Sequence, residues 1–124
     1  MNLLFVSLFS MLMSTEAAPT TSMVGRNVDD FKLQDFRGAW HTLGESKGKV
    51  VVVAFLGIEC PLVKVYAPRL VELANKLGPG GVDVIAINPN SQDSVTELAS
   101  FARRHNIEFP ILKDVGNKVA DAWS

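Results

Sequence analysis

The sequence has a single cysteine, Cys60, among its 124 residues. One thiol excludes an internal disulfide framework, and it excludes sites that need two or more thiolates, such as a structural zinc or an iron–sulfur cluster. The sequence also lacks an excess of positive or negative charge, because it has 12 basic and 13 acidic residues. With a pI near 6.1, the charge gives no reason to expect a nucleic-acid partner. Any thiol chemistry of this chain depends on Cys60.

Near the amino terminus the sequence is apolar, but not over the length of a membrane span. Residues 3–13 are apolar except for Ser7 and Ser10, which matches the hydrophobic region of a signal peptide and falls short of the ~20 residues of a spanning helix. Ala17 offers a cleavage site. We therefore expect residues 1–17 to be a signal peptide and the protein to be exported, to the periplasm or outside the cell. The alternatives are an uncleaved anchor or a wrongly assigned start codon, because no basic residue precedes the run.

The remaining sequence has the composition and length of one folded domain. Hydrophobic residues make up 48% of the chain and charged residues 20%, as in ordinary globular proteins. Residues 18–30 are mostly small or polar and read as a linker. We expect the domain to occupy residues 31–124.

Hydrophobic patterns predict an alternation of strands and helices. Apolar and polar residues alternate on either side of Arg37-Gly38, which indicates a short hairpin within residues 31–42. The block VVVVAFL at residues 50–56 is continuously apolar, which predicts a central strand buried on both faces. Residues 61–77 carry apolar side chains at helical spacing, with Pro61 in the first turn and Pro68 expected to kink the helix. The predicted buried stripe consists of Leu62, Tyr66, Leu70, Leu73 and Leu77, widened by Val63 and Val71.

The second half of the chain repeats this alternation. Residues 82–88 read as a strand, and Ser94 with Glu97 has the spacing of a capping box at the start of the next helix. Residues 109–112 read as a short strand interrupted by Pro110, and residues 117–123 as a final helical turn or two. The order predicts an α/β fold with right-handed crossovers and a largely parallel sheet.

Cys60 is the one position with a chemical signature. It follows the predicted central strand and begins the next helix, where unpaired N–H groups and the helix dipole stabilise a thiolate. Lys64 lies on the same helical face and favours the anion, whereas the carboxylate of Glu59 disfavours it. The alternative is a small buried hydrophobe, as many free cysteines are. For His41 and His105 we expect ordinary surface or structural roles.

Residues 50–70 resemble the active-site strand and helix of the thioredoxin-like superfamily. The similarity is closest to the redoxin branch of the alkyl hydroperoxide reductase/thiol-specific antioxidant family, with Cys60-Pro61, Lys64 and Pro68 at the matching positions. It extends over about residues 24–123, including the lead-in 25–30, the strand 82–88 and the segment 109–114. The resemblance implies a three-layer sandwich with a central mixed sheet.

The sequence departs from that family at several positions. Val63 stands where thioredoxins have a second cysteine, so exchange within the motif is impossible. Val53 and Gly57 replace the proline and the hydroxyl residue of typical peroxiredoxins. The cis-proline loop and closing hairpin do not follow residues 117–123. We therefore expect a C-terminally truncated domain with an open sheet edge and exposed apolar surface.

The resemblance implies a thiol-dependent oxidoreductase or antioxidant enzyme. In that interpretation Cys60 and Lys64 are catalytic, and Gly57, Glu59 and Pro61 contact the substrate. No metal or cofactor is implied. The expected partners are a peroxide or disulfide substrate, an external thiol reductant and a second copy of the chain, with no nucleic acid. The alternative is a non-catalytic thioredoxin-like binding or structural module in which Cys60 only packs.

Overall fold

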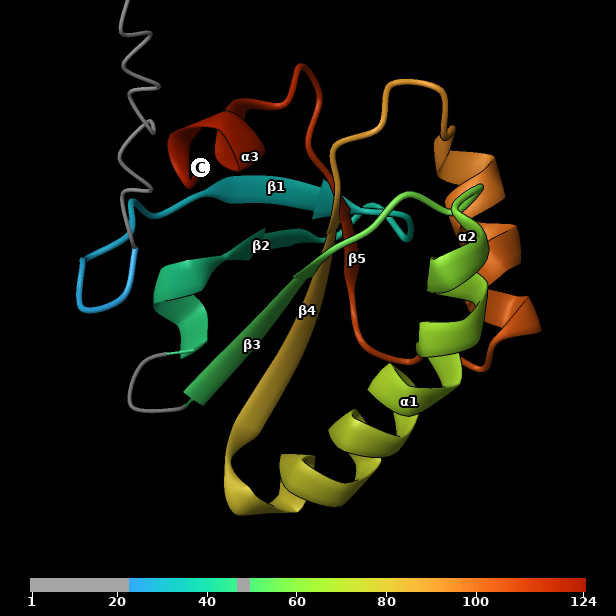
Figure 1. Ribbon diagram of the computed structural model, residues 1–124, viewed down its shortest axis with the longest axis horizontal. Coiled ribbons are helices and arrows are strands. Elements are labelled where there is room, and N and C mark those ends of the chain that lie inside the picture. Colours follow the sequence, from blue (N-terminus) through green and yellow to red (C-terminus); the bar gives the residue numbers. More distant parts are fainter. Residues whose placement is uncertain (1–22, 47–49) are drawn as a thin grey trace, which may run out of the picture.

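The computed structural model describes residues 23–46 and 50–124. The predicted signal peptide, residues 1–17, lies outside this part of the chain, as do residues 18–22 of the predicted linker. Five strands form one sheet in the order β2-β1-β5-β4-β3 (Figure 1). The elements are β1 Lys32–Asp35, β2 Trp40–Thr42, β3 Val50–Phe55, α1 Pro61–Leu77, β4 Val82–Asn88, α2 Val95–Arg104, β5 Ile111–Lys113 and α3 Lys118–Ala122, with 3-10 turns at Leu43–Ser46 and Gly78–Gly80.

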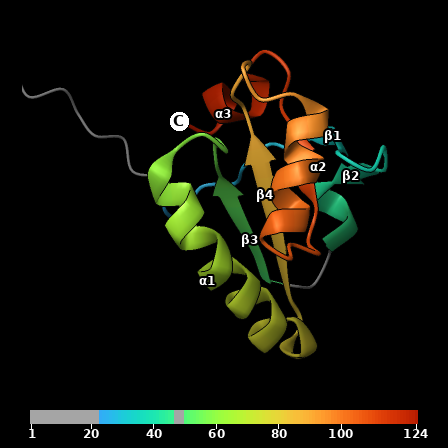
Figure 2. The same cartoon turned by 90° about the vertical axis from the view of Figure 1, so that its right-hand side faces the viewer.

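The sheet is mixed, as the sequence predicted. β3, β4 and β5 run parallel, whereas β1 is antiparallel to both β2 and β5. Helices α1 and α2 cover one face and α3 lies on the other, which gives three layers (Figures 1 and 2). One hydrophobic cluster forms under α1 and α2 around Leu98 and Phe101, and a second forms under α3 around Ile87 and Leu112. The predicted α/β sandwich is therefore confirmed.

The apolar block that begins at Val50 forms an edge strand, so its prediction as the central, most buried strand is wrong. Within the described residues, β3 pairs with β4 alone, and the Val50 side chain is 64% exposed. Its apolarity has another cause: Val52 packs under α1 and α2, and Val51 and Val53 pack toward α3. Both faces are covered, but face burial does not determine whether a strand has two neighbours. The most buried strand is β4, whose residues 84–88 are all buried.

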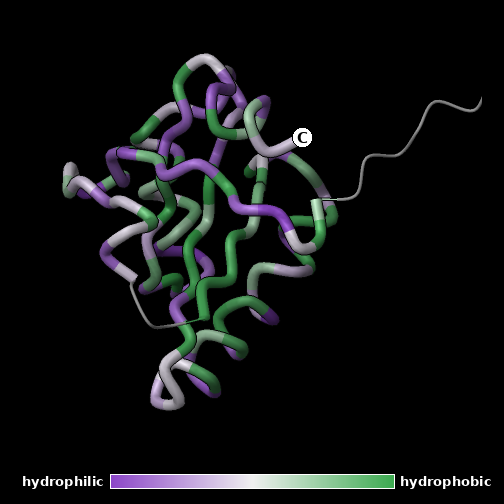
Figure 3. Tube along the Cα trace, turned by 90° about the vertical axis from the view of Figure 1, so that its left-hand side faces the viewer, coloured by the Kyte–Doolittle hydropathy of each residue, from purple (hydrophilic) through white to green (hydrophobic). Residues whose placement is uncertain are grey.

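The edge strand β3 and the interior strand β4 have similar hydropathy. Figure 3 shows hydrophobic stretches running side by side through the middle of the molecule. β3 and β4 are in register from Val50 opposite Val82 to Phe55 opposite Ile87. Two adjacent strands therefore carry similar apolar patterns, although only one of them is an interior strand.

Helix α1 begins with Pro61 in its first turn, as predicted, and continues through Pro68. The face that it buries agrees with the predicted stripe only in part, because Val63, Leu70, Val71 and Leu73 pack against the core and the other three predicted residues do not. Leu62 and Tyr66 are 65% and 51% exposed, and Leu77 is exposed as well. The sheet is covered by a face centred on Ala67, with Val63, Leu70, Val71, Leu73 and Ala74 partly buried around it. The first turns of α1 are apolar on several sides, so spacing alone identified the inner face only in part.

The two short sequence signals around α2 and the hairpin are confirmed. Ser94 and Glu97 form the predicted capping box, with Glu97 N–H donating to Ser94 Oγ and Ser94 N–H donating to Glu97 Oε2. β1 and β2 form the predicted hairpin, with Gly38 at a φ of 85° in its turn. That positive φ is accessible to glycine at little cost.

β5 begins after Pro110, so the predicted strand at 109–112 is shifted. It covers Ile111–Lys113, because proline has no N–H to donate to a neighbouring strand. The Pro110 carbonyl still accepts a hydrogen bond from the Ala86 N–H over 2.9 Å. Phe109 is buried in the core but lies outside the strand. This shift places Lys113 at the carboxyl end of β5.

Candidate functional site

Cys60 is exposed and is the N-cap residue of α1. Its N–H donates to the Gly57 carbonyl over 3.1 Å, and its own carbonyl accepts from the N–H groups of Val63 and Lys64 at 3.1 and 3.4 Å. No side chain caps this helix. The thiol thus lies at the positive end of α1, where the first-turn N–H groups have no side-chain acceptor. The predicted junction of strand and helix is present, and the exposure does not fit the alternative of a buried, packed cysteine.

The other predicted site residues surround Cys60 in sequence, and most are exposed. Glu59, Pro61 and Lys64 are exposed, and Gly57 is half-buried. Neither the Glu59 carboxylate nor the Lys64 ammonium makes a hydrogen bond or ion pair with the residues that the structure describes. The backbone N–H of Lys64 donates to the Cys60 carbonyl, and its side chain is exposed.

Two hollows flank the site. The first has a volume of about 450 Å³ and lies beside Gly57, lined also by Pro89, Asn90, Ser91, Gly116 and Asn117. The second, of about 260 Å³, lies between β3 and α1 and is lined by Ala54, Phe55, Leu56, Leu62, Val63, Tyr66 and Leu70. One hollow is bordered mainly by loops and the other is apolar. Cys60 itself lines neither hollow; Gly57 joins the first to the Cys60 loop, and Leu62 and Val63 join the second to the first turn of α1.

Below the Cys60 loop lies a buried polar group that we call the Asp93 cluster, which consists of Asn88, Asn90, Asp93 and Lys113. Asp93 is 2% exposed and accepts a hydrogen bond from the Ile58 N–H over 2.9 Å. Asn88 Nδ2 donates to Asp93 Oδ2 at 2.6 Å and to the Leu56 carbonyl at 2.9 Å. The loop that leads to Cys60 is thus hydrogen-bonded to side chains at the end of β4 and before α2.

Lys113 supplies the positive charge of this cluster. Its ammonium donates to Asn88 Oδ1 and to the Asp93 carbonyl, both over 2.7 Å, and to the Asn90 carbonyl. The residue is half-buried, and an ammonium in such a place needs its donors satisfied. Asn88 links the two charged residues, because its Oδ1 accepts from Lys113 and its Nδ2 donates to the Asp93 carboxylate.

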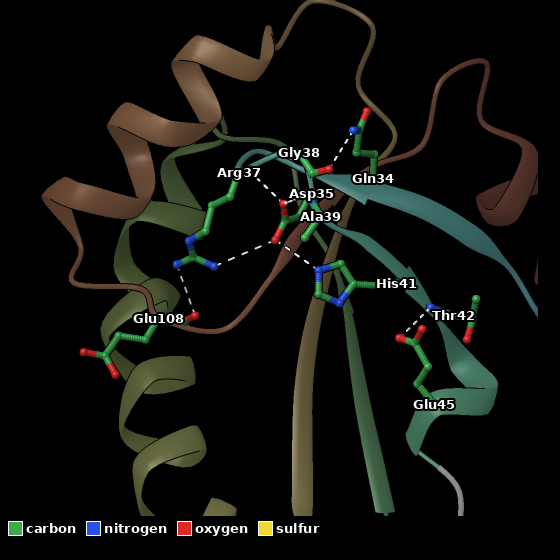
Figure 4. A network of polar contacts seen from close by, with 9 residues as sticks. All are labelled: Gln34, Asp35, Arg37, Gly38, Ala39, His41, Thr42, Glu45 and Glu108. Carbon is green, nitrogen blue, oxygen red and sulfur yellow. Dashed lines mark hydrogen bonds and ion pairs between the residues drawn. The ribbon is translucent and has the colours of Figure 1, made fainter.

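A second buried carboxylate, Asp35, organises the hairpin (Figure 4). It accepts hydrogen bonds from the N–H groups of Arg37 and Ala39 at 2.8 and 2.9 Å, and it contacts His41 Nε2 at 3.0 Å. Burial raises the pKa of Asp35, but the hydrogen bonds from His41, Ala39 and Arg37 together outweigh it and lower that pKa below its ordinary value. His41 therefore has the structural role that the sequence predicted.

His105 also has a structural contact. Its ring lies 4.4 Å from that of Phe101, measured between centroids, so it packs on the end of α2.

Within residues 23–46 and 50–124 there is no group of three or more His, Cys, Asp or Glu side chains that could hold a metal ion. In the same part of the chain, no helix has both the length and the apolarity to cross a membrane.

The sequence did not point to the Asp93 cluster. The sequence predicted Asn88 only as the last residue of a strand and did not single out Asn90 or Asp93. One signal was available: Lys113 is a charged residue that directly follows Ile111 and Leu112 in a buried strand, and such a residue needs a partner. Its partners come from a different strand and loop, so their identity requires the fold.

Comparison with known proteins agrees with this arrangement. Residues 24–124 match the AhpC/TSA family. The thiol-disulfide oxidoreductase ResA of Halalkalibacterium halodurans is 32% identical over 99 residues, which cover 80% of this chain and 55% of that protein. The chain therefore spans about half the length of this curated relative.

Two solved structures extend the comparison. An uncharacterized conserved protein from Geobacillus kaustophilus is 32% identical with a TM-score of 0.75, over 80% of this chain and 56% of that one. Peroxidoxin BcpB from Mycobacterium tuberculosis is 26% identical with a TM-score of 0.67, over 77% and 62%. With its mixed sheet, its cysteine at the start of α1 and the match over residues 24–124, the chain belongs to the AhpC/TSA family of thioredoxin-like proteins.

Proposed function

We propose that this chain carries the reactive centre of a thiol-disulfide oxidoreductase, with Cys60 as its nucleophile. The observation that carries the proposal is the exposed thiol at the N-cap position of α1, at the positive end of the helix dipole. Such a position favours the thiolate, which is the reactive form. The similarity to the oxidoreductase ResA over 80% of this chain supports the same chemistry.

In the proposed reaction the Cys60 thiolate attacks one sulfur of a substrate disulfide. A new S–S bond joins Cys60 to that sulfur, the substrate S–S bond breaks, and its second sulfur leaves as a thiolate. An external thiolate then attacks the Cys60 sulfur of the mixed disulfide and joins to it, and the first substrate sulfur leaves as a thiolate. A second external thiolate attacks the external sulfur now bound to Cys60, so that the two external sulfurs form a disulfide and Cys60 leaves as a thiolate. The external thiol is oxidised and the substrate disulfide is reduced, so the cycle needs no metal or cofactor.

The proposed resolving thiol is external to these 124 residues. Cys60 is the only cysteine in the sequence, and Val63 occupies the position where a resolving cysteine would follow within the helix turn. A small thiol or a thioredoxin-like reductant fits this role. The exposure of Cys60 and its neighbours leaves the approach open to either.

Four neighbours complete the proposed site. Lys64, one helical turn after Cys60, adds positive charge near the thiolate, whereas Glu59 opposes it. Gly57 and Pro61 flank the thiol, and with Glu59 they form the surface that contacts the substrate.

We also propose that residues 1–17 direct export, because their apolar run has the length of a signal peptide.

Peroxide reduction is a second candidate, favoured by the match to the AhpC/TSA family and by the similarity to a peroxidoxin at 26% identity. In that reaction the thiolate attacks one peroxide oxygen, the O–O bond breaks, and Cys60 becomes a sulfenic acid while the alcohol or water leaves. Gly57 offers no hydroxyl to hold the peroxide. This difference favours the disulfide reaction.

Turnover assays with Cys60→Ser test the proposal. We expect the wild-type chain to reduce a small disulfide with glutathione as the external thiol, and Cys60→Ser to lose this activity at an unchanged circular dichroism spectrum. Hydrogen peroxide in place of the disulfide measures the second candidate. Equal turnover by both proteins with both substrates would contradict the enzymatic function and favour a non-catalytic binding module.

A further inference from the structure

The backbone of the loop before Cys60 is fixed on both sides of Gly57. The Leu56 carbonyl accepts from Asn88 Nδ2 over 2.9 Å, and the Ile58 N–H donates to Asp93 Oδ2 over 2.9 Å. Leu56 and Ile58 are both buried, at 5% and 3% exposure. A backbone group at such a site costs free energy if it loses its partner, because water does not readily replace it.

The carboxylate of Asp93 is itself held in place. Its Oδ2 accepts from Asn88 Nδ2 at 2.6 Å, in addition to the Ile58 N–H, and its Oδ1 accepts from Asn90 Nδ2 at 3.1 Å. The Asn90 side chain also lies close to Gly57: a Cβ added to Gly57 would be 3.6 Å from Asn90 Nδ2. The carboxylate is therefore oriented by two amides and aimed at the loop.

The Asp93 cluster has no group left over for a substrate. Lys113 directs its ammonium to Asn88 Oδ1 and to the carbonyls of Asn90 and Asp93, which uses all three of its donors. Of the cluster, Asn88 and Asp93 are fully buried. These contacts suit the cluster for holding the loop, not for reacting with a ligand.

We propose that Asp93 is a positioning residue for Cys60. Through Ile58, it fixes the loop that holds Cys60 at the N-cap position of α1, where the positive end of the helix dipole favours a thiolate. The inference rests on the proposed function, in which Cys60 is the reacting group. Asp93 acts through the backbone two residues before Cys60 and is not itself a catalytic residue.

The test compares Asp93→Asn with Asp93→Ala in the full chain. Asn keeps an oxygen that accepts from the Ile58 N–H but removes the charge, whereas Ala removes both. The measurement is the rate of Cys60 alkylation by iodoacetamide against pH, which gives the thiol pKa. We expect this pKa to be higher in Asp93→Ala than in Asp93→Asn by about half a unit, or about threefold less thiolate below the pKa, the size of a helix N-terminus effect.

Equal thiol pKa values in the two variants would overturn the proposal, because Asp93 would then act through its charge or through stability alone. Asp35→Ala is the matched control, since it removes a buried carboxylate that also binds backbone N–H groups, and it should leave the Cys60 pKa at the wild-type value. If Asp93→Ala does not fold, Asp93→Ser replaces it in the same comparison. Alkylation needs no turnover, so its result is independent of the Cys60→Ser assay that tests the proposed function.

Discussion

Asp35 and Asp93 are buried carboxylates that hold loops in different ways. The partners of Asp35 are Arg37, Ala39 and His41, all within six residues along the chain. Asp93 reaches Ile58, which is 35 residues away. A local carboxylate can organise its turn as soon as the hairpin forms, whereas a long-range one acts only after the strands of the sheet have assembled. The comparison suggests that the Cys60 loop depends on the whole fold and the hairpin turn does not.

The largest expected effect is the difference in stability between Asp93→Ala and Asp35→Ala. Asp93→Ala leaves the buried Ile58 N–H without its acceptor and removes one of the two acceptors of Asn88 Nδ2. We expect it to lower the free energy of unfolding by about 3 kcal/mol, and Asp35→Ala by about 1.5 kcal/mol, because the partners of Asp35 are nearer to solvent. Urea unfolding followed by circular dichroism measures both. If the two variants lost equal stability, or Asp35→Ala lost more, the sequence separation of the contacts would not determine how much they stabilise the fold.

An intermediate effect is expected from pH and concerns Asp35 alone. Its pKa in the folded chain lies below the ordinary value of 3.8, so the folded state binds its proton less readily than the unfolded state. The stabilisation is therefore present above pH 3.8 and is lost as the pH falls through the lowered pKa. We expect the stability difference between wild type and Asp35→Asn to shrink over that acidic range. A difference that stays constant with pH would contradict this assignment.

The smallest expected effect is at Gly57, between the Cys60 loop and the Asp93 cluster. A Cβ there would lie 3.6 Å from Asn90 Nδ2 and 3.8 Å from Asp93 Oδ2, which are ordinary contacts. We expect Gly57→Ala to change the free energy of unfolding by no more than about 0.5 kcal/mol and the alkylation rate of Cys60 by less than about twofold. A loss comparable to that of Asp93→Ala would show that the loop and the cluster pack more tightly than these distances indicate.

Local signals in the sequence predicted much of the fold. The capping box of Ser94 and Glu97, the turn at Gly38 and the first-turn Pro61 each depend on neighbours within a few residues, and each is present. The position of Cys60 followed from two adjacent elements, the end of a strand and the start of a helix. Such features need no knowledge of the tertiary structure.

The features that the sequence did not predict depend on distant neighbours. The edge position of β3 is one of them, because an apolar sequence indicates that both faces of a strand are covered and does not indicate how many strands pair with it. The prediction for α1 is correct for Val63, Leu70, Val71 and Leu73 and wrong for the exposed Leu62, Tyr66 and Leu77, since apolar residues occur on several sides of the helix. The role of Asp93 could not be predicted because its hydrogen-bond donor, the Ile58 N–H, lies on another loop.

The single exposed thiol sets an upper limit on how copies of this chain can be cross-linked. Each molecule has one sulfur that can join another, and Cys60 is that sulfur. Oxidation between copies therefore ends at a covalent pair and cannot continue into longer chains. Each pair formed in this way masks both of its reactive centres until a reductant separates them.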